Sequence, residues 1–368
     1  MEWYLIANVA TLDTPALVVY PDRVQRNIAL LKTFVSDPRQ LRPHIKTNKC
    51  PQVISLMLEA GITKFKCATI AEAEMAAIEG APDVLLAYQP TGPKARRFCE
   101  LQRKFPKTLF SCLIDNQKSL SELSALATVY DLTIRVFIDL NVGMNRTGIA
   151  PGKEALQLYR DASGTQGIEM AGLHAYDGHL RDADFDLRKQ KCDEAFAPVE
   201  SLRQQIIQAT TKNPIVVAGG TPTFPIHAKR KDVEASPGTF VFWDKGYQQT
   251  LAEQPFEWAA LVVTRVISKP DDQTICLDLG HKSIAAENPI TSRVYLLNAP
   301  TLEPIGHSEE HMVFRSKKNE RYEIGDVLYG VPYHICPTVA LYEEAAVCRD
   351  HQVADWWPIQ SRKRKITI

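Results

Sequence analysis

Short apolar runs alternate with amphipathic helical patterns over the first two thirds of the sequence, and this alternation limits the possible folds. Residues 14–20, T-P-A-L-V-V-Y, precede apolar residues at helical spacing from Val24 to Phe34. The same unit recurs as far as the run that ends at Gly219-Gly220. Parallel neighbouring strands need a crossover, which helices of this length supply. About eight such units predict a closed (β/α)8 barrel of the TIM type.

After about residue 245 the pattern changes. Apolar runs such as Trp258 to Ser268 and Gln273 to Leu279 are separated by Pro, Gly, Asn and Asp, without long helical patterns between them. Short apolar runs separated by turn residues are typical of antiparallel strands. We therefore predict a barrel over residues 13–245 and a second, mainly antiparallel β domain formed by residues 1–12 plus 246–368.

Composition narrows the classes of partner and the compartment. Lys+Arg and Asp+Glu number 43 each, so the net charge of zero argues against nucleic acid and anionic membranes and favours a small molecule. The eight cysteines form no disulfide-like framework. The chain begins without a leader pattern, and no window approaches the roughly 18 apolar residues of a membrane span. These features predict a cytoplasmic protein.

A cationic stretch, L-R-P-H-I-K-T-N-K-C from Leu41 to Cys50, follows the first helical pattern. It places Lys46 at the end of the second predicted strand, and parallel barrels carry their active sites at the C-terminal ends of the strands. We interpret Lys46 as the amine that forms an imine with pyridoxal 5'-phosphate (PLP), with His44 and Arg42 tuning the pKa of that amine. A capping or salt-bridging lysine is the alternative.

Two further strand ends carry candidate cofactor contacts. The loop from Asp139 to Gly148, rich in glycine and asparagine, presents Arg146, which we predict to contact the phenolate oxygen of the cofactor or its lysine end. The next strand ends in H-A-Y-D-G-H. There Tyr176 is predicted to stack on the cofactor ring or bond to it, and His179 to take a proton from a substrate hydroxyl. The alternatives are an arginine paired with a loop carboxylate and structural histidines.

Glycine turns follow the last two predicted strands of the barrel. Gly219-Gly220-Thr221 and Ser236-Pro237-Gly238-Thr239 expose backbone N–H groups beside threonine hydroxyls. Such turns bind phosphate. Gly220, Thr221, Gly238 and Thr239 are therefore the predicted phosphate contacts.

A candidate metal pair lies in the predicted β domain, in the stretch V-P-Y-H-I-C-P-T. On a strand, residues i and i+2 point to the same side, so His334 and Cys336 can converge on one ion. Two protein ligands leave coordination positions open, and histidine with thiolate favours zinc. The alternative is a buried cysteine beside an unrelated histidine.

Together these motifs resemble the D-threonine aldolase and D-serine dehydratase family, the fold-type III PLP enzymes related to alanine racemase. The motifs are T-P-A-L, R-P-H-I-K-T-N-K, G-M-N-R-T-G, H-A-Y-D-G-H, G-G-T-P, E-A-S-P-G-T-F-V-F-W-D and H-I-C-P-T-V, and they span nearly the whole chain. The resemblance implies that Lys46 carries PLP, that the Arg146 loop touches its O3' side, and that the two glycine turns hold its phosphate.

The resemblance also implies a divalent metal at His334 and Cys336, with zinc favoured and manganese or magnesium as alternatives. It implies a homodimer in which one subunit's barrel and the other's β domain share the active site. The chain departs from the family at two positions: Asn48 replaces a histidine of the usual K-T-H-K, and Ser236 replaces the arginine that pairs with the pyridine nitrogen in the racemases.

The expected activity is a lyase reaction on a β-hydroxy-D-amino acid. In the leading hypothesis the metal binds the β-hydroxyl, His179 or a metal-bound water takes its proton, and retro-aldol cleavage gives glycine and an aldehyde. A zinc-dependent dehydratase of D-serine or D-threo-3-hydroxyaspartate is the first alternative. An amino-acid racemase and a non-catalytic PLP-binding protein are the others.

Overall fold

The computed structural model describes residues 1–318 and 320–368, which form two compact units. The barrel unit comprises Leu31–Lys46, Ile54–Gly238 and Lys363–Ile368, and the β unit comprises Met1–Leu30, Thr47–Val53 and Thr239–Arg362. The described helices are α1 (Pro21–Thr33), α2 (Pro51–Glu59), α3 (Ile70–Ile78), α4 (Pro93–Lys104), α5 (Gln117–Tyr130), α6 (Lys153–Gly164), α7 (Phe185–Thr210), α8 (Phe224–His227), α9 (Lys245–Thr250) and α10 (Ile335–Val339).

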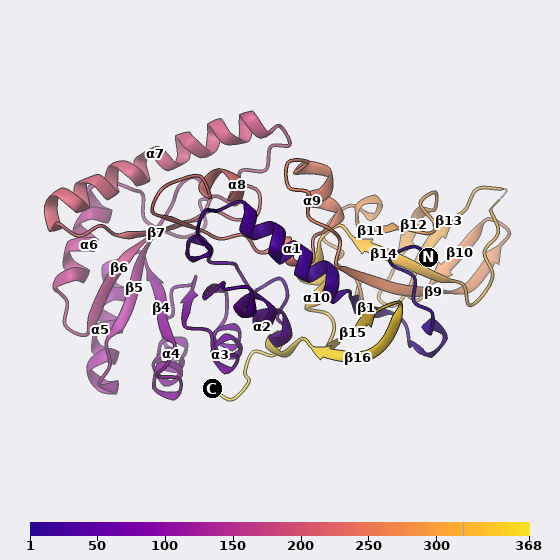
Figure 1. The fold of residues 1–368 in the computed structure, drawn as a ribbon, viewed down its shortest axis with the longest axis horizontal. Coiled ribbons are helices and arrows are strands. Elements are labelled where there is room, and N and C mark those ends of the chain that lie inside the picture. The colour runs from indigo at the N-terminus through magenta and orange to yellow at the C-terminus, as the bar shows by residue number, and fades with distance from the viewer. Residues whose placement is uncertain (319) are drawn as a thin grey trace. The chain divides into compact units, whose positions relative to one another are not determined.

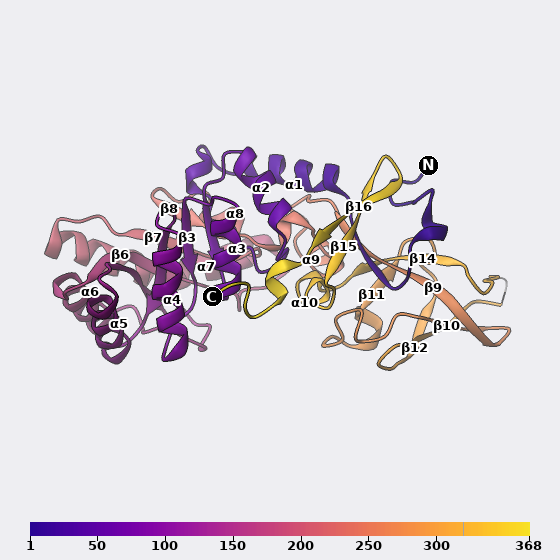
Figure 2. The same cartoon turned by 90° about the horizontal axis from the view of Figure 1, so that it is seen from below.

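A parallel sheet of seven strands forms the barrel unit, in the order in which the strands occur along the chain. Helices α3, α4 and α5 follow one another around its outer side (Figures 1 and 2). Side-chain caps begin several of these helices: the Asn116 side chain, for example, accepts a hydrogen bond from Ser119 N at 2.9 Å at the start of α5. The strands are β2 (Lys64–Cys67), β3 (Asp83–Leu86), β4 (Leu109–Ile114), β5 (Ile134–Leu140), β6 (Ile168–Ala175), β7 (Ile215–Ala218) and β8 (Val233–Ala235).

The segment Leu41 to Lys46 closes this sheet into a ring, since it forms parallel bridges to β8 and β2. On one side Arg42 N donates to Ala235 O at 2.9 Å, and on the other Lys66 N donates to Pro43 O at 2.8 Å. The segment is therefore held by backbone hydrogen bonds to a neighbour on each side. The predicted (β/α)8 barrel with a mainly antiparallel second domain is confirmed.

Residues 14–20 were expected to form the first strand of the barrel, and this prediction is wrong. Their strand β1 (Ala16–Val19) pairs antiparallel with β9 and parallel with β15 in the β unit, and β8 supplies the strand missing from the barrel count. All four residues of β1 are buried. A strand covered on both faces carries the same apolar run in either kind of sheet, so its composition does not identify its partners.

The β unit contains a sheet of nine strands, antiparallel except for the pairing of β1 with β15. Its path runs β12-β13-β10-β9-β1-β15-β16, and β14 pairs with both β9 and β11. The N-terminal residues Trp3 and Tyr4 pack against its apolar core beside Tyr20 and Tyr329. The further strands are β9 (Ala260–Asp271), β10 (Thr274–Leu277), β11 (Val294–Leu296), β12 (Glu303–His307), β13 (Met312–Arg315), β14 (Val327–Pro332), β15 (Glu344–Arg349) and β16 (Gln352–Pro358).

The barrel interior has an apolar layer and a charged layer. The apolar layer is a cluster of Leu85, Leu113, Phe137 and Val217. The charged layer lies nearer the N-terminal ends of the strands and centres on Arg42, which has no exposed side-chain area. Arg42 Nε donates to Glu234 at 2.6 Å and its Nη1 to Asp83 at 2.7 Å.

Two more cations complete this charged layer. Lys64 pairs with Glu234, and Arg135 Nη1 lies 3.8 Å from Asp83. The buried guanidinium of Arg42 is therefore neutralised inside the barrel, where it braces strands β3 and β8. Arg42 was predicted to tune the amine of Lys46, but its charge is already compensated by these carboxylates.

Within residues 1–318 and 320–368, no helix has the length and apolar character needed to cross a membrane.

Replacing Arg42 by alanine is expected to lower the free energy of unfolding by about 3–5 kcal/mol, because the Glu234 and Asp83 carboxylates would stay buried without their shared cation. Urea denaturation followed by circular dichroism measures the loss. Arg39→Ala is the control, since Arg39 pairs with Asp37 at the surface and should matter little. Equal stability of the two variants would contradict a bracing role for Arg42.

Candidate active site

Lys46 is the last residue of the ring-closing segment. His44 N donates to Pro237 O at 2.8 Å, which holds this end of the segment against the residues after β8. The next residues fold back locally, since Lys46 N donates to His44 Nδ1 at 3.2 Å. Both side chains are half-buried. The amine therefore lies at the C-terminal end of the ring, where a barrel active site is expected.

Tyr176, directly after β6, is the centre of the candidate site. Three cationic groups lie near its ring: Lys46 Nζ is 6.0 Å, Lys66 Nζ 5.5 Å and Arg146 Cζ 5.2 Å from the centroid. An electron-rich ring attracts cations placed over its face. A Cβ added to Gly220 would lie 2.8 Å from Tyr176 Cε2, so the ring rests against the backbone of the first predicted phosphate turn.

The loop that carries Arg146 is shaped by Asn141. Its side-chain oxygen accepts hydrogen bonds from Gly143 N at 3.1 Å and Asn145 N at 3.0 Å, and Gly148 N donates to Asp115 at 3.0 Å. Arg146 is exposed on this loop.

His179 lies against the backbone of the same loop. A Cβ on Gly143 would meet His179 Nε2 at 2.8 Å, and the His179 side chain is exposed. The imidazole therefore belongs to the rim of the barrel, where it is accessible to a ligand.

The two predicted phosphate turns meet, because Gly238 N donates to Thr221 Oγ1 at 3.1 Å. In the first turn, Gly220 N donates to Thr223 Oγ1 at 3.3 Å and Phe224 N to Gly220 O at 2.8 Å. The last predicted phosphate contact, Thr239, is buried in the β unit, where Trp243 N donates to its carbonyl oxygen at 2.7 Å.

A buried carboxylate–histidine pair, Asp139 and His174, lies on the interior of the barrel and was not predicted. His174 Nδ1 is 2.7 Å from Asp139 Oδ1, and Gln89 donates to Asp139 Oδ2 at 2.8 Å. Burial lowers the pKa of His174 despite the Asp139 bond. Burial also acts to raise the pKa of Asp139, but its hydrogen bonds outweigh burial and that pKa is lowered. His174 Nε2 is buried without a hydrogen-bond partner in residues 1–318 and 320–368.

A second buried network supports the Tyr176 strand end and the first glycine turn. Asp177 accepts from Thr223 Oγ1 at 2.6 Å and bonds His227 Nε2 at 2.8 Å, and Cys192 Sγ lies 3.4 Å from the same nitrogen. Asp177, Cys192 and His227 are the cluster of three potential metal-ligating side chains found in residues 1–318 and 320–368.

The environment of this cluster is that of a hydrogen-bond network. Arg230 Nε donates to His227 Nδ1 at 3.3 Å, which makes Nε2 the protonated nitrogen that donates to Asp177. Burial raises the pKa of the Cys192 thiol to about 12, and a thiol in that state is a poor metal ligand. A Cβ on Gly219 would meet His227 and Thr223, so the network packs directly on the glycine turn.

The predicted metal pair belongs to the β unit and is not on a strand. Strand β14 ends at Pro332, His334 precedes α10, and Cys336 lies inside α10, so the predicted strand geometry is wrong. The two side chains are nonetheless hydrogen-bonded to each other. Cys336 Sγ also lies 3.0 Å from the hydroxyl of Thr47 and 3.8 Å from that of Thr239.

Two carboxylates hold this pair. His334 Nδ1 donates to Glu287, and Ile335 N donates to the buried Asp244 at 3.2 Å. Burial acts to lower the pKa of His334, but its bonds to Cys336 and Glu287 raise it to about 9. Burial raises the pKa of Asp244 to about 6. Histidine, thiol and carboxylate are the donor set that zinc prefers.

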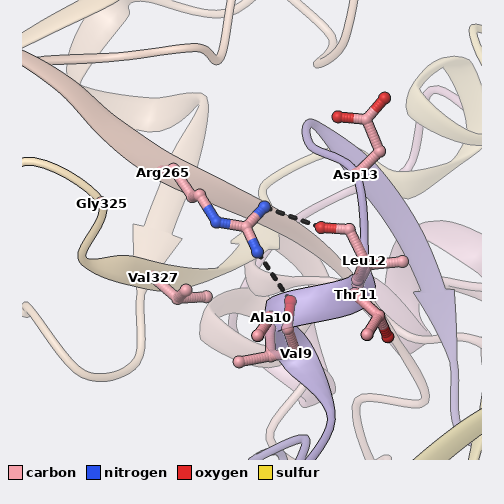
Figure 3. A pocket seen from close by; sticks show the side chains of 8 residues that line it. All are labelled: Val9, Ala10, Thr11, Leu12, Asp13, Arg265, Gly325 and Val327. Atoms are coloured by element: carbon pink, nitrogen blue, oxygen red, sulfur yellow. Dashed lines mark hydrogen bonds between the residues drawn. The ribbon is translucent and has the colours of Figure 1, made fainter.

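A hollow elsewhere in the β unit contains the contacts that hold the N-terminal segment. It is lined by residues 9–13 and by Arg265, Gly325 and Val327, and Arg265 donates to Val9 O at 2.6 Å and Leu12 O at 2.7 Å (Figure 3). The guanidinium therefore ties the N-terminal segment to β9.

Among the predicted site residues, the structure brings Lys46, Arg146 and Tyr176 together in the barrel unit. The pairs that sequence reasoning missed share one property: their members lie on different elements. Asp139 and His174 are opposite each other in the register of β5 and β6, and Glu287 is 47 positions from His334. No spacing motif connects such residues.

The chain is similar to several known proteins along nearly its whole length. Residues 19–245 match the family model of the alanine racemase N-terminal domain, and residues 259–348 match that of a putative serine dehydratase domain. The chain is 28% identical over 362 residues to the D-threonine aldolase of Arthrobacter sp., covering 96% of this chain and 94% of that protein.

Two further matches cover both expected reaction types. The chain is 27% identical over 249 residues to the D-threo-3-hydroxyaspartate dehydratase of Delftia sp. (strain HT23), covering 64% of this chain and 63% of that protein. The crystal structure of the D-threonine aldolase from Filomicrobium marinum has a TM-score of 0.87 at 25% identity, covering 96% of this chain and 97% of that one.

Replacing Asp177 by asparagine is expected to lower the free energy of unfolding by about 3 kcal/mol at neutral pH, since the buried network would lose its charge. Burial acts to raise the pKa of Asp177, but its bonds outweigh it and lower that pKa below 3.8. The carboxylate therefore contributes stability above pH 3.8 that is lost as the pH falls through the lowered pKa.

The gap between wild type and Asp177→Asn should accordingly shrink as the pH is lowered from about 6 toward about 3. Urea denaturation at a series of pH values measures this gap. Asp186→Asn, on the exposed first turn of α7, is the control and should change little. A gap that does not depend on pH would contradict the assigned role of the Asp177 charge.

Proposed function

The chain belongs to the family of the alanine racemase N-terminal domain, whose model matches residues 19–245. We propose that it is a lyase dependent on PLP and a divalent metal. The proposed reaction cleaves a β-hydroxy-D-amino acid to glycine and an aldehyde. The observation that carries the proposal is the convergence of Lys46 and Arg146 on Tyr176, over the backbone of Gly220. The similarity to D-threonine aldolase over 96% of the chain supports it.

The buried polar atoms of the barrel interior fit the cofactor. Val217 belongs to the interior apolar cluster, and the strand register pairs it with His174 on β6 and with Glu234 on β8. Paired residues point to the same side of a sheet, so His174, Glu234 and Ser236 all point inward. His174 Nε2 and Ser236 Oγ are buried without a hydrogen-bond partner, as expected for groups that contact a ligand.

Each residue of the barrel site has a proposed role toward the cofactor. The amine of Lys46 would hold it covalently, with His44 and Tyr176 bounding its ring, and Arg146 would neutralise its phenolate oxygen. When bound, the cofactor supplies an electron sink for the electrons released at the substrate α-carbon. The proposed phosphate contacts are Gly220, Thr221, Gly238 and Thr239.

The proton of the substrate hydroxyl is the second requirement of retro-aldol cleavage. We assign its removal to His179, which is exposed at the rim of the barrel, against the Arg146 loop. An imidazole accepts a proton near neutral pH and returns it within one catalytic cycle.

His334 and Cys336 would hold the divalent metal, with zinc favoured by the nitrogen and sulfur donors and manganese or magnesium as alternatives. A metal there supplies Lewis-acid activation of the substrate hydroxyl. Glu287 accepts the proton of His334 Nδ1 and so leaves Nε2 available to the ion, the usual arrangement of a carboxylate behind a metal-binding histidine. Asp244 anchors the backbone between the two ligands.

Dehydration is the second candidate reaction. The thiol ligand Cys336 resembles that of the zinc-dependent dehydratases, and D-threo-3-hydroxyaspartate dehydratase is one of the similar proteins. D-serine or D-threo-3-hydroxyaspartate would then yield a keto acid and ammonia. An amino-acid racemase or a non-catalytic PLP-binding protein would have no use for the His334–Cys336 pair.

The proposal extends to assembly and compartment. The family resemblance supports a homodimer with a shared active site, acting on a small D-amino acid rather than on nucleic acid or membrane. All eight cysteines are free thiols, which supports a reducing, cytoplasmic compartment.

A direct product assay tests the reaction. The enzyme supplied with PLP and Zn²⁺ is expected to convert D-threonine to glycine and acetaldehyde, and Lys46→Ala, which lacks the cofactor-binding amine, should give no turnover. Chromatography of the amino acids and an aldehyde assay measure the products. Ammonia with 2-oxobutyrate would indicate a dehydratase instead, and racemisation that persists after chelation with EDTA would indicate a racemase.

Metal binding provides an independent check. Glu287→Gln is expected to weaken Zn²⁺ affinity about 10- to 100-fold, because His334 would lose the carboxylate that orients it. Competition with a chromophoric chelator measures the affinity. Glu310→Gln, a surface glutamate paired with Lys282, is the matched control and should bind Zn²⁺ like wild type. Equal affinities of the two variants would contradict the proposed orienting role.

A further inference from the structure

Lys66, on strand β2, is a buried lysine inside the barrel that the proposed reaction does not yet use. It is 1% exposed and pairs in register with Leu85, a member of the interior apolar cluster, so its side chain points inward. Within the described residues, the one hydrogen bond of its side chain is long, 3.4 Å from Nζ to Gly219 O. Within residues 1–318 and 320–368, the structure gives Lys66 no ion pair.

The two carboxylates that act on the charge of Lys66, Asp139 and Asp177, already accept hydrogen bonds from other side chains. Asp139 accepts bonds from His174 and Gln89, and Asp177 accepts bonds from Thr223 and His227. A buried ammonium without a counter-ion is costly. Burial, reinforced by the charge of Lys46, accordingly lowers the pKa of the Lys66 amine to about 7.

Lys64, on the same strand, shows the contrast. It points to the same side of β2, but it reaches Glu234 in the charged layer and is partly exposed. Of these two lysines, separated by one residue, Lys64 forms an ion pair and Lys66 forms none within the described residues. A buried polar group of this kind indicates a bound group that completes its hydrogen bonding.

Several other polar atoms of the barrel interior are buried and have no hydrogen-bond partner within residues 1–318 and 320–368. His174 Nε2 and Ser236 Oγ are buried without partners on β6 and in the residues after β8. Together with Lys66 Nζ, which reaches the carbonyl of Gly219 after β7, they form a set of polar groups on the inner wall of the barrel. The ring of Tyr176, 5.5 Å from Lys66 Nζ, lies among the residues proposed to hold the cofactor.

From this set we infer that Lys66 is the hydrogen-bond partner of the ring nitrogen of the cofactor, in the role that the racemases give to an arginine and this chain does not give to Ser236. The inference rests on the proposed function. In PLP the ring nitrogen is para to the ring carbon that carries the aldehyde with which Lys46 would form its imine, so it lies on the opposite side of the ring. The phosphate, by contrast, is assigned to the backbone of the glycine turns.

This assignment has a chemical consequence for the cofactor. Two adjacent positive charges in a buried site repel each other, so Lys66 and the ring nitrogen share one proton between them. The charged and titratable groups that act on Lys66 or on its neighbour His174 are Lys46, Arg42, Arg146, Asp139 and Asp177. A lysine in this place, unlike an arginine, can give up its proton and leave the ring nitrogen protonated.

Nuclear magnetic resonance of the holoenzyme tests the assignment. The enzyme is loaded with PLP labelled with ¹⁵N at the ring nitrogen, and Lys66→Met is compared with wild type. The ¹⁵N resonance is expected to move, because the ring nitrogen loses its partner, while the ³¹P resonance of the phosphate stays in place. Lys64→Met, the same substitution two residues earlier, is the control and should leave both resonances unchanged.

Two outcomes overturn the inference. A ³¹P change without a ¹⁵N change would mean that Lys66 contacts the phosphate, and no change in either resonance would mean that Lys66 is only a structural residue. If Lys66→Met does not fold, Lys66→Gln replaces it: the amide keeps a polar group but cannot share a proton with the ring nitrogen, so the ¹⁵N resonance is again expected to move. Failure of the wild-type protein to bind PLP would instead contradict the proposed function, so the two failures are distinguishable.

Discussion

The structure of the barrel unit depends on its closure by the segment Leu41 to Lys46. Pro43 has no N–H, so this segment cannot complete a regular ladder and forms isolated bridges instead. Other backbone groups of the segment bond both sides of the ring: the carbonyl of Pro43 accepts from Lys66 N, and the amides of Arg42 and His44 donate to Ala235 O and Pro237 O. The buried guanidinium of Arg42 adds two carboxylate contacts. Because Lys46 is the last residue of this segment, the closure fixes where its backbone leaves the barrel wall.

The two ends of the barrel interior are chemically opposite. Toward the N-terminal ends of the strands, every charge described above has a counter-charge, as the contacts of Arg42 with Glu234 and Asp83 show. Toward the C-terminal ends, Ser236 and His174 have buried polar atoms without partners. Glu234 and Ser236 are two residues apart and point to the same side, yet one is saturated and the other is not. The charges near the N-terminal ends are paired, although Arg135 Nη1 has no hydrogen-bond partner within the described residues, and the polar atoms near the C-terminal ends are free to contact a ligand.

In the β unit, the junction between β14 and α10 places the proposed metal ligands. His334 precedes the helix and Cys336 lies in its first turn, so a change of backbone conformation, rather than strand alternation, brings the two side chains together. Asp244 caps α9 through Tyr247 N and also accepts from Ile335 N, which links the two short helices. Side-chain positions at such a junction are determined by these carboxylate bonds, which cross large separations in the sequence.

Much of the fold and part of the site were readable from the chain alone. The alternation of apolar runs with helical patterns was sufficient for the barrel, and the position of Lys46 at a strand end followed from it, because both depend on local spacing. The assignment of residues 16–19 to the wrong sheet shows the limit, since an apolar run does not name the strands that bury it.

The interior lysine shows the same limit. In K-F-K-C the alternation places Lys64 and Lys66 on one side of a strand. The sequence does not indicate that this side is the inside of the barrel, or that Lys64 rather than Lys66 reaches a carboxylate. The sequence by itself determined the elements, the turns and the chemical types of residue at the strand ends. Only the tertiary structure decided which of those residues meet, because the register of β5 with β6 and the contacts of Arg42, Tyr176 and His334 join residues that are distant along the chain.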